Sequence, residues 1–247
     1  MYTPKVVIVG AGQLGSRHLQ GLIKCPIKLD ISVIDINRQS LARAKSMWVE
    51  AGGQRRPHIV SWSSGFAYCD RTVDIAIVAT PACQRGILVE EISRQFNVRY
   101  WILEKVLGQS KEELDSILAS VSRSEGAWVN TPRRMMSFYG RLKEKIVKQR
   151  IDRISFGGGP WGLASNSIHI IDLASWWSGE SFQAFETIGL DREWSHAKRK
   201  GHCEIFGRAV ARFTGDLELE LISCRKNMAP FFTVLLSDGE RWSIDEA

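Results

Sequence analysis

The chain has 247 residues; 44% are hydrophobic, 24% are charged, and 33 Lys and Arg against 27 Asp and Glu give a formal net charge of +6. This length suits one large domain or two modest ones with their own cores, and the composition is that of a globular protein rather than a disordered one. The basic excess is modest and no helix-turn-helix or aromatic-basic platform accompanies it, which argues against a nucleic-acid-binding protein. No apolar run approaches the ~20 residues that span a bilayer.

The first half of the chain alternates β-branched runs with amphipathic stretches. The expected strands cover residues 5–10, 30–36, 58–62, 73–80, 100–106 and 127–131, and the expected helices cover 14–23, 38–48, 85–96 and 110–121. Ser110, with Glu113 three residues on, predicts a capping box at the start of the last helix. Apolar strands that alternate with helices predict a parallel sheet covered on both faces.

The second half follows a different pattern, with two helices around a glycine-rich strand and then a series of alternating strands. The expected helices cover 138–149 and 166–177, and the expected strands cover 153–159, 185–190, 207–213, 217–223, 231–237 and 241–245. "SDGE" at 237–240 predicts a hairpin turn. We therefore expect a doubly wound α/β domain over 1–128 and a smaller α+β domain, with a largely antiparallel open sheet, over 129–247.

The stretch "GAGQLG" fits the pattern G-x-G-x-x-G directly after a strand and at the start of a helix. In that context Gly10 permits the tight turn, Gly12 lets the backbone approach a pyrophosphate, and Gly15 lets the helix pack on the strand. Gln13 and Leu14 then begin the helix whose positive end would face the pyrophosphate. The alternative is a glycine turn that binds no nucleotide.

Asp35 follows the second strand, twenty residues after the last glycine of the motif. A carboxylate there can accept hydrogen bonds from ribose hydroxyls and repels a 2′-phosphate, so the sequence favours NAD as the cofactor, with NADP as the alternative. Arg38 keeps that alternative open, because a nearby cation can receive the phosphate or stack on adenine.

Four stretches give the chain a resemblance to the glucose–fructose oxidoreductase, inositol dehydrogenase and MocA family: "VVIVGAGQLGSRHLQGL", "VDIAIVATPACQRG", "WILEKVLGQS" and "SNSIHIIDLASWWSG". The resemblance implies an N-terminal Rossmann domain, a C-terminal α/β domain with a large open sheet, and nicotinamide-dependent oxidoreduction of a sugar. Members usually run ~80 residues longer, so we expect a short variant or a fragment.

By this resemblance, "EKV" stands at the family's Glu-Lys-Pro, which makes Lys105 the active-site lysine and places Glu104 beside the cofactor. Val106 replaces a proline that is often cis, so we expect the loop that carries Lys105 to differ in conformation. Thr80 and Pro81 match the loop that runs past the nicotinamide. Arg85 stands where many relatives carry a histidine, and the sequence assigns it no role.

The later motif places His169 at the family's proton-accepting histidine, with Ser165 where many members have an aspartate four residues earlier. Asn166 joins them as an expected substrate contact, and Asp172 is expected to orient the imidazole or to tie the helix down. Arg134 lies in a segment similar to a family stretch near the substrate. With Arg133 it could hold a phosphate or carboxylate, and surface salt bridging is the equal alternative.

The sequence thus predicts a cytoplasmic oxidoreductase that transfers a hydride between NAD and a sugar or nucleotide sugar. Catalysis is assigned to Lys105 and His169. The alternative is a non-catalytic dinucleotide-binding protein or partner subunit. We expect no metal, no nucleic acid and no membrane partner, and a homo-oligomer formed through the C-terminal sheet if that sheet is complete. A basic run at 196–202 could suit an anionic ligand, but most such runs are solvated loops.

Overall fold

The structure is a computed structural model that describes residues 2–66, 71–146, 148–197 and 203–246. Residues 198–202 of the basic run therefore lie outside the described residues. The chain divides into two compact units, Met1–Asn130 and Thr131–Ala247, and each is described by itself. Within the described ranges, no helix is both long and apolar enough to cross a membrane.

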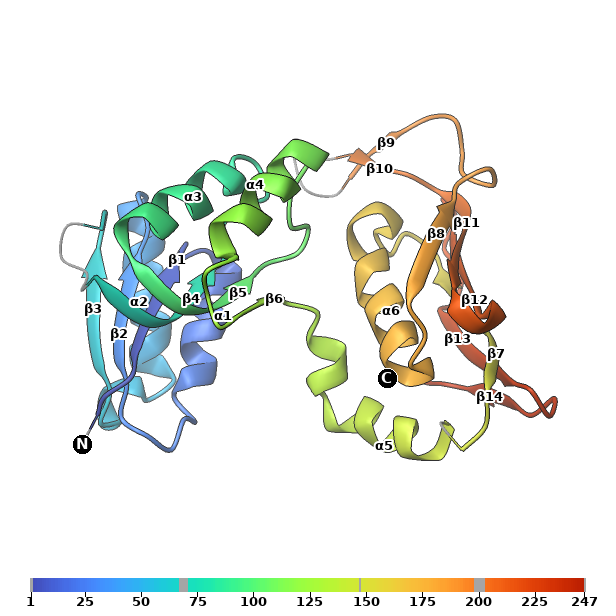
Figure 1. The fold of residues 1–247 in the computed structure, drawn as a ribbon, viewed down its shortest axis with the longest axis horizontal. Coiled ribbons are helices and arrows are strands. Elements are labelled where there is room, and N and C mark those ends of the chain that lie inside the picture. Colours follow the sequence, from blue (N-terminus) through green and yellow to red (C-terminus); the bar gives the residue numbers. More distant parts are fainter. Residues whose placement is uncertain (1, 67–70, 147, 198–202, 247) are drawn as a thin grey trace. The chain divides into compact units, whose positions relative to one another are not determined.

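The first unit is a doubly wound α/β fold around a six-stranded parallel sheet (Figure 1). Its strands are β1 (Lys5–Val9), β2 (Asp30–Ile34), β3 (Ile59–Ser63), β4 (Thr72–Val78), β5 (Asn97–Leu103) and β6 (Gly126–Val129). Its helices are α1 (Gln13–Leu22), α2 (Arg38–Glu50), α3 (Arg85–Gln95) and α4 (Lys111–Val121), with a 3-10 turn η1 (Gly53–Arg55). The parallel sheet expected from the alternating pattern is confirmed.

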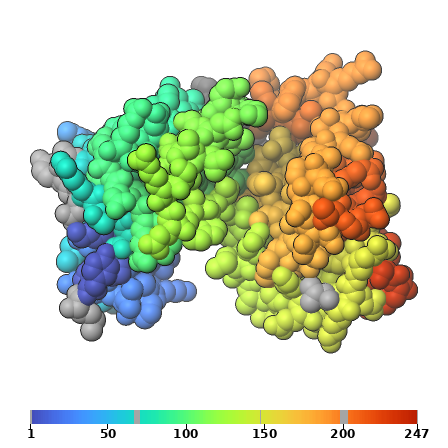
Figure 2. All heavy atoms as spheres, in the orientation of Figure 1, coloured from blue at the N-terminus to red at the C-terminus, as the bar shows by residue number. Residues whose placement is uncertain are grey.

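Both faces of this sheet are covered, because its central strands are apolar at successive positions. One hydrophobic cluster contains Val6 and Ile8 of β1 with Leu19 of α1 and Trp48 of α2. The other contains residues of α3 and α4 packed on the opposite side chains of the same strands. In Figure 2 the atoms of α3 and α4, coloured teal to green, form much of the near surface of the first unit.

The second unit is an α+β fold around a mixed six-stranded sheet of order β14-β13-β7-β12-β11-β8. Its elements are η2 (Pro132–Met135), α5 (Ser137–Ile146), β7 (Ile151–Gly158), α6 (Leu163–Ser178), β8 (Phe182–Glu186), β9 (Ser195–His196), β10 (Cys203–Glu204), β11 (Gly207–Phe213), η3 (Thr214–Asp216), β12 (Glu218–Ser223), β13 (Phe231–Leu236) and β14 (Arg241–Ser243). The sheet is largely antiparallel, as expected, but β7 and β12 pair in parallel.

One expected strand is displaced along the chain. The pattern at 185–190 predicts a strand, whereas β8 covers Phe182–Glu186 and pairs with β11. The chain then turns, because the amide of Leu190 donates to the carbonyl of Thr187 at 2.9 Å. The hairpin expected at "SDGE" joins β13 to β14, with Gly239 at a φ of +89°.

The core of the second unit forms where α6 packs on one face of the sheet. Trp177 of α6 is 1% exposed, stacks on Phe232 with ring centroids 5.5 Å apart, and donates its indole N–H to the carbonyl of Tyr139 at 3.3 Å. The same cluster includes Ile154 and Leu219 of the central strands. This packing fixes the helix that carries His169.

Replacing Trp177 by alanine should lower the free energy of unfolding by about 3–5 kcal/mol, because it opens a cavity in a dense core. Trp194, which is 61% exposed, is the matched control, and its alanine variant should stay within about 0.5 kcal/mol of the parent. Urea unfolding followed by circular dichroism measures both. Equal losses in the two variants would contradict the assignment of this core.

Candidate functional site

The strand order of the first unit, β3-β2-β1-β4-β5-β6, reverses between β1 and β4. In open α/β sheets, ligands bind outside the carboxyl ends of the strands at such a switch point. The glycine loop follows β1, and Thr80 follows β4 at the same edge of the sheet. The residues that the sequence predicts for the cofactor therefore converge on this edge.

The three glycines of the loop meet different steric conditions. Gly10 has a φ of +96°, and a Cβ on Gly15 would lie 1.7 Å from the carbonyl oxygen of Gly10. A Cβ on Gly12 would meet no atom within 4 Å. Gly10 and Gly15 are therefore required by the fold itself, whereas the space beside Gly12 is open to a ligand. Gly12 is also the N-cap of α1, and no side chain of the described residues caps that helix.

Asp35 holds the glycine loop against the end of β2. Its carboxylate accepts the amide of Ala11 at 2.7 Å and the amide of Asn37 at 2.7 Å. Asp35 thus has a structural role in the loop. Two amides use only part of the capacity of a carboxylate, which has about four acceptor positions, so acceptor positions remain for a ligand.

The start of α2 adds an apolar residue that the sequence reasoning missed. Asn37 caps this helix by accepting the amides of Gln39 and Ser40, and Arg38 is exposed in its first turn. Ile36, directly after Asp35, is 91% exposed. A large apolar side chain held in solvent beside Asp35 is the signal that could have marked it as a surface for a flat apolar ligand group.

Glu104 follows β5 and is 3% exposed. Its Oε1 bonds to Nε2 of His18 at 2.7 Å and accepts Nδ2 of Asn130 at 2.8 Å. Burial alone would raise the pKa of this carboxyl, but the hydrogen bonds from His18 and Asn130, with the charges of His18 and Arg85, lower it below 4.5. Glu104 is therefore an ionised group that joins the middle of α1 to the ends of β5 and β6.

Lys105 is half-buried at the carboxyl end of β5. Burial lowers the pKa of its ammonium group from 10.5, and the neighbouring charge of Glu104 opposes that shift. The peptide bond between Lys105 and Val106 is cis. The expectation that valine in place of proline would change this conformation is wrong in that respect, because the bond keeps the cis form that the family's proline often has.

Two further features of this edge concern Thr80 and Arg85. Thr80 Oγ1 is buried and has no hydrogen-bond partner among the described residues. Pro81, beside it, is exposed. Arg85, to which the sequence assigned no role, is 1% exposed and donates to backbone carbonyls of the loops after β4 and β5. The sequence could not indicate this role, because the partners of Arg85 are backbone carbonyls and no residue type marks them.

In the second unit, the amino end of α6 is a polar cluster. Ser165 Oγ contacts the carbonyl of Gly162 at 3.3 Å, and Asn166 Nδ2 donates to the carbonyl of Trp161 at 2.7 Å. The carboxylate of Glu204 accepts the amide of Ala164 at 3.0 Å, so a residue from β10 caps the helix. His169 lies one turn further along α6 and is half-buried.

The arginine pair is already engaged within the second unit. Arg134 forms a bidentate ion pair with Asp172, with Nε 2.9 Å from Oδ2 and a second short contact from Nη2. Arg133 pairs with Glu246 and with the hydroxyl of Tyr139. The salt-bridging alternative describes both arginines in this structure. Asp172 therefore ties α6 to η2. This is the second of the two roles expected for it, that of tying the helix down.

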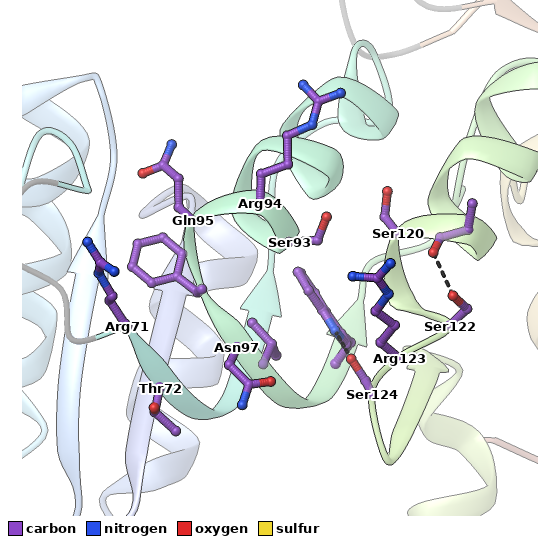
Figure 3. Close-up of a pocket in the computed structure, with 14 residues that line it drawn as sticks. Arg71, Thr72, Ser93, Arg94, Gln95, Asn97, Ser120, Ser122, Arg123 and Ser124 are labelled. Atoms are coloured by element: carbon purple, nitrogen blue, oxygen red, sulfur yellow. Dashed lines mark hydrogen bonds between the residues drawn. The ribbon is translucent and has the colours of Figure 1, made fainter.

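Two other features concern metal binding and a pocket away from the residues described above. Among the described residues no group of three or more histidine, cysteine and acidic side chains could hold a metal ion. A pocket of about 650 Å³ lies at the amino ends of β4 and β5, which is the opposite edge of the sheet from the glycine loop (Figure 3). Some of its hydroxyls donate to helix carbonyls, such as Ser122 to Ala119 and Ser120 to Ser116, and its lining also includes Arg71, Arg94 and Arg123.

Comparison with solved structures identifies the fold. A scyllo-inositol dehydrogenase from Lactobacillus casei, solved with NAD(H) and scyllo-inositol, matches with a TM-score of 0.71 and 18% identity over 100% of this chain and 77% of its own. A myo-inositol 2-dehydrogenase from Lactobacillus plantarum matches with a TM-score of 0.71, 19% identity and coverage of 100% and 77%. A probable dehydrogenase from Thermotoga maritima matches with a TM-score of 0.68 and 18% identity, over 98% of this chain and 76% of its own.

These matches show that the chain has the two-unit fold of these dehydrogenases, as the sequence resemblance implied. At this level of identity they establish the fold alone. No protein-family model matches the sequence, and no curated protein sequence matches it significantly. The case for a function therefore depends on the residues of the site.

The Glu104 network makes a prediction about stability and pH. The folded-state pKa of Glu104 lies below its unfolded-state value, so its ionised form stabilises the fold above that value, and the stabilisation is lost as the pH falls through the folded pKa. At pH 7, Glu104→Gln should lower the free energy of unfolding by about 1.5–3 kcal/mol. Urea unfolding at neutral and acid pH should show this difference shrinking as the pH falls.

The control for this measurement is Glu91→Gln, which changes an exposed carboxyl on α3. Its effect on unfolding should be small at both pH values. A difference between wild type and Glu104→Gln that is the same at neutral and acid pH would show that the carboxyl of Glu104 is not ionised in the folded protein.

Proposed function

We propose that this chain is an NAD-dependent oxidoreductase that oxidises a secondary hydroxyl of a sugar or cyclic polyol, or reduces the corresponding ketone. The observation that carries the proposal is the convergence of the glycine loop, Asp35 and Lys105 at the carboxyl edge of one parallel sheet. The solved inositol dehydrogenases with NAD(H) and scyllo-inositol or myo-inositol support the choice of cofactor and substrate class.

The residues at this edge fit a dinucleotide. The open space beside Gly12 and the uncapped amino end of α1 suit a pyrophosphate, because backbone amides and the helix dipole both favour an anion there. The free acceptor positions of Asp35 suit ribose hydroxyls and disfavour a 2′-phosphate, which supports NAD over NADP. Thr80, whose hydroxyl has no partner among the described residues, is assigned to the nicotinamide side of the site.

Lys105 is assigned to the reacting oxygen of the substrate. Its lowered pKa makes proton exchange with a substrate hydroxyl easier near neutral pH than for an ordinary lysine. The ammonium form stabilises the alkoxide that develops as the carbon–hydrogen bond breaks. When bound, the nicotinamide ring supplies the hydride acceptor. His169 is assigned to removing the hydroxyl proton, since a neutral imidazole is a good base near pH 7.

The substrate is proposed to be uncharged. The arginines that could have held a phosphate are paired with Asp172 and Glu246, and releasing them would expose two carboxylates. A hydroxyl-rich ring suits the amide and hydroxyl groups of Ser165 and Asn166 at the start of α6. A nucleotide sugar is the second substrate class to test. The basic run at 196–202 could suit its phosphates, and residues 198–202 of that run lie outside the described residues.

Self-association through the open face of the second sheet belongs to the same proposal. That face carries ion pairs between neighbouring strands, including Arg153 with Glu218 and Arg208 with Glu220. Arg212 bridges Glu186 and Glu218. A contact built on such charges would weaken as the salt concentration rises.

The cofactor assignment predicts different outcomes for two glycine substitutions. Gly12→Val should weaken NAD⁺ binding by about tenfold or more and leave the thermal unfolding midpoint nearly unchanged, because its side chain enters open space. Gly15→Val should lower the unfolding midpoint, because its Cβ collides with the backbone of Gly10. Calorimetric titration and thermal unfolding measure the two effects. Unaltered NAD⁺ affinity in Gly12→Val would contradict this binding mode.

The catalytic assignment predicts that Lys105→Met and His169→Ala each lower kcat by about 10²–10⁴-fold while the Kd for NAD⁺ stays within a small factor. Reduced nicotinamide is followed by absorbance over a panel of cyclic polyols, sugars and nucleotide sugars. Lys111→Met is the control, since Lys111 is an exposed lysine paired with Asp115 at the start of α4. NAD⁺ binding without turnover on any substrate would favour the alternative of a non-catalytic dinucleotide-binding protein.

A further inference from the structure

Arg85 is a buried cation whose partners are backbone carbonyls. It is the first residue of α3, and its side chain is 1% exposed. Nη1 donates to the carbonyl of Glu104 at 2.5 Å, to that of Leu107 at 3.1 Å and, at short range, to that of Val106. Nη2 donates to the carbonyl of Thr80, also at short range. Four carbonyls from two loops therefore bind one guanidinium.

These four carbonyls belong to the loops that follow β4 and β5. A parallel strand leaves its last carbonyls without partners at the carboxyl edge of the sheet, and buried carbonyls need donors. The planar guanidinium carries five N–H groups in a fixed fork. One side chain can therefore satisfy acceptors in both loops and fix the spacing between them.

Arg85 is not held in place by an ion pair. The structure gives its guanidinium no salt bridge among the described residues, and the carboxylates of Glu104 and Glu113 act on that guanidinium as nearby charges. Burial lowers the pKa of its guanidinium, and those two charges oppose the shift. Burying a cation without a direct counter-ion is costly, and an apolar side chain of similar size would avoid that cost. A role beyond packing explains the choice of arginine.

Glu113 fastens the same loop to the same helix from the other side. Its carboxylate accepts the amide of Gly86 at 2.9 Å and the amide of Gln109 at 2.7 Å. The capping box expected at Ser110 is thus only half formed: Ser110 Oγ accepts the amide of Glu113 at 3.2 Å, while the carboxylate reaches α3. A Cβ on Gly86 would lie 2.8 Å from Cγ of Glu113, so the approach is close.

We infer that Arg85 is a positioning residue for Lys105. The carbonyls on either side of Lys105, those of Glu104 and Val106, bind the same Nη1 atom, so the backbone at Lys105 cannot move without breaking both contacts. The contact with Thr80 joins that backbone to the loop after β4. Arg85 thereby sets where the amine of Lys105 lies relative to the nicotinamide side of the cofactor site, a role that rests on the proposed function.

The test uses the reactivity of the Lys105 amine, which needs no turnover. The full chain is labelled with an amine-reactive reagent over a range of pH, and mass spectrometry follows the peptides that contain Lys105 and the exposed Lys24. In the wild type, Lys105 should label at lower pH than Lys24. The labelling midpoint is the pH at which half of a lysine is labelled. In Arg85→Met, which keeps side-chain bulk and removes the donors, the labelling midpoint of Lys105 should rise toward that of Lys24.

The control is Arg94→Met. Arg94 lies on the same helix, is exposed, and pairs with Glu90 one turn away, so its replacement should leave the Lys105 midpoint unchanged. If Arg85→Met does not fold, Arg85→Lys carries the test: it keeps a cation but cannot span four carbonyls, and the midpoint should again rise. A folded Arg85 variant with the wild-type Lys105 midpoint overturns the inference.

Kinetics separate this inference from the proposed function. With an active wild type, Arg85→Met should lower kcat by about tenfold or more while the Kd for NAD⁺ changes by less than about threefold. An unchanged kcat overturns the role of Arg85 and leaves the proposed function standing. A raised Lys105 midpoint in a protein that turns over no substrate supports the positioning role and overturns the proposed function.

Discussion

The site depends on one constraint of parallel sheets: all strands end at the same edge, and the polar groups left there must be satisfied. Three of the side chains that hold this edge together are Asp35, Glu104 and Arg85. Asp35 accepts the amide of Ala11, Glu104 binds His18 and Asn130, and Arg85 donates to four carbonyls. Because these groups fix the loops after β1, β4 and β5, they also place the open space beside Gly12 and the amine of Lys105.

The sequence predicted the parts of this edge that obey local rules. The glycine spacing, the apolar strands and the position of Asp35 each follow from backbone geometry over fewer than about thirty residues. Gly10 and Gly15 have the steric roles assigned to them, and the space beside Gly12 is open. The parallel sheet follows from the alternation of apolar strands and helices, whereas the order of its strands comes from the structure.

The sequence could not predict contacts that join distant segments through the backbone. Arg85 binds carbonyls about twenty residues away, and a carbonyl is present at every position, so no residue pattern marks its partners. Glu204 caps α6 from forty residues away in the same manner. Glu113 was expected to close its own capping box, but the amide of Gly86, brought near by packing between α3 and α4, takes its carboxylate instead.

The most direct test of the proposed oxidoreduction is to follow the transferred hydrogen. The protein is incubated with NAD⁺ and cyclic polyols or sugars deuterated on carbon, and the nucleotide is analysed by mass spectrometry. The account predicts that reduced nicotinamide appears with one deuterium from the substrate carbon, and that Lys105→Met forms almost none. A nucleotide that binds the protein and is recovered oxidised and unlabelled with every substrate would contradict it.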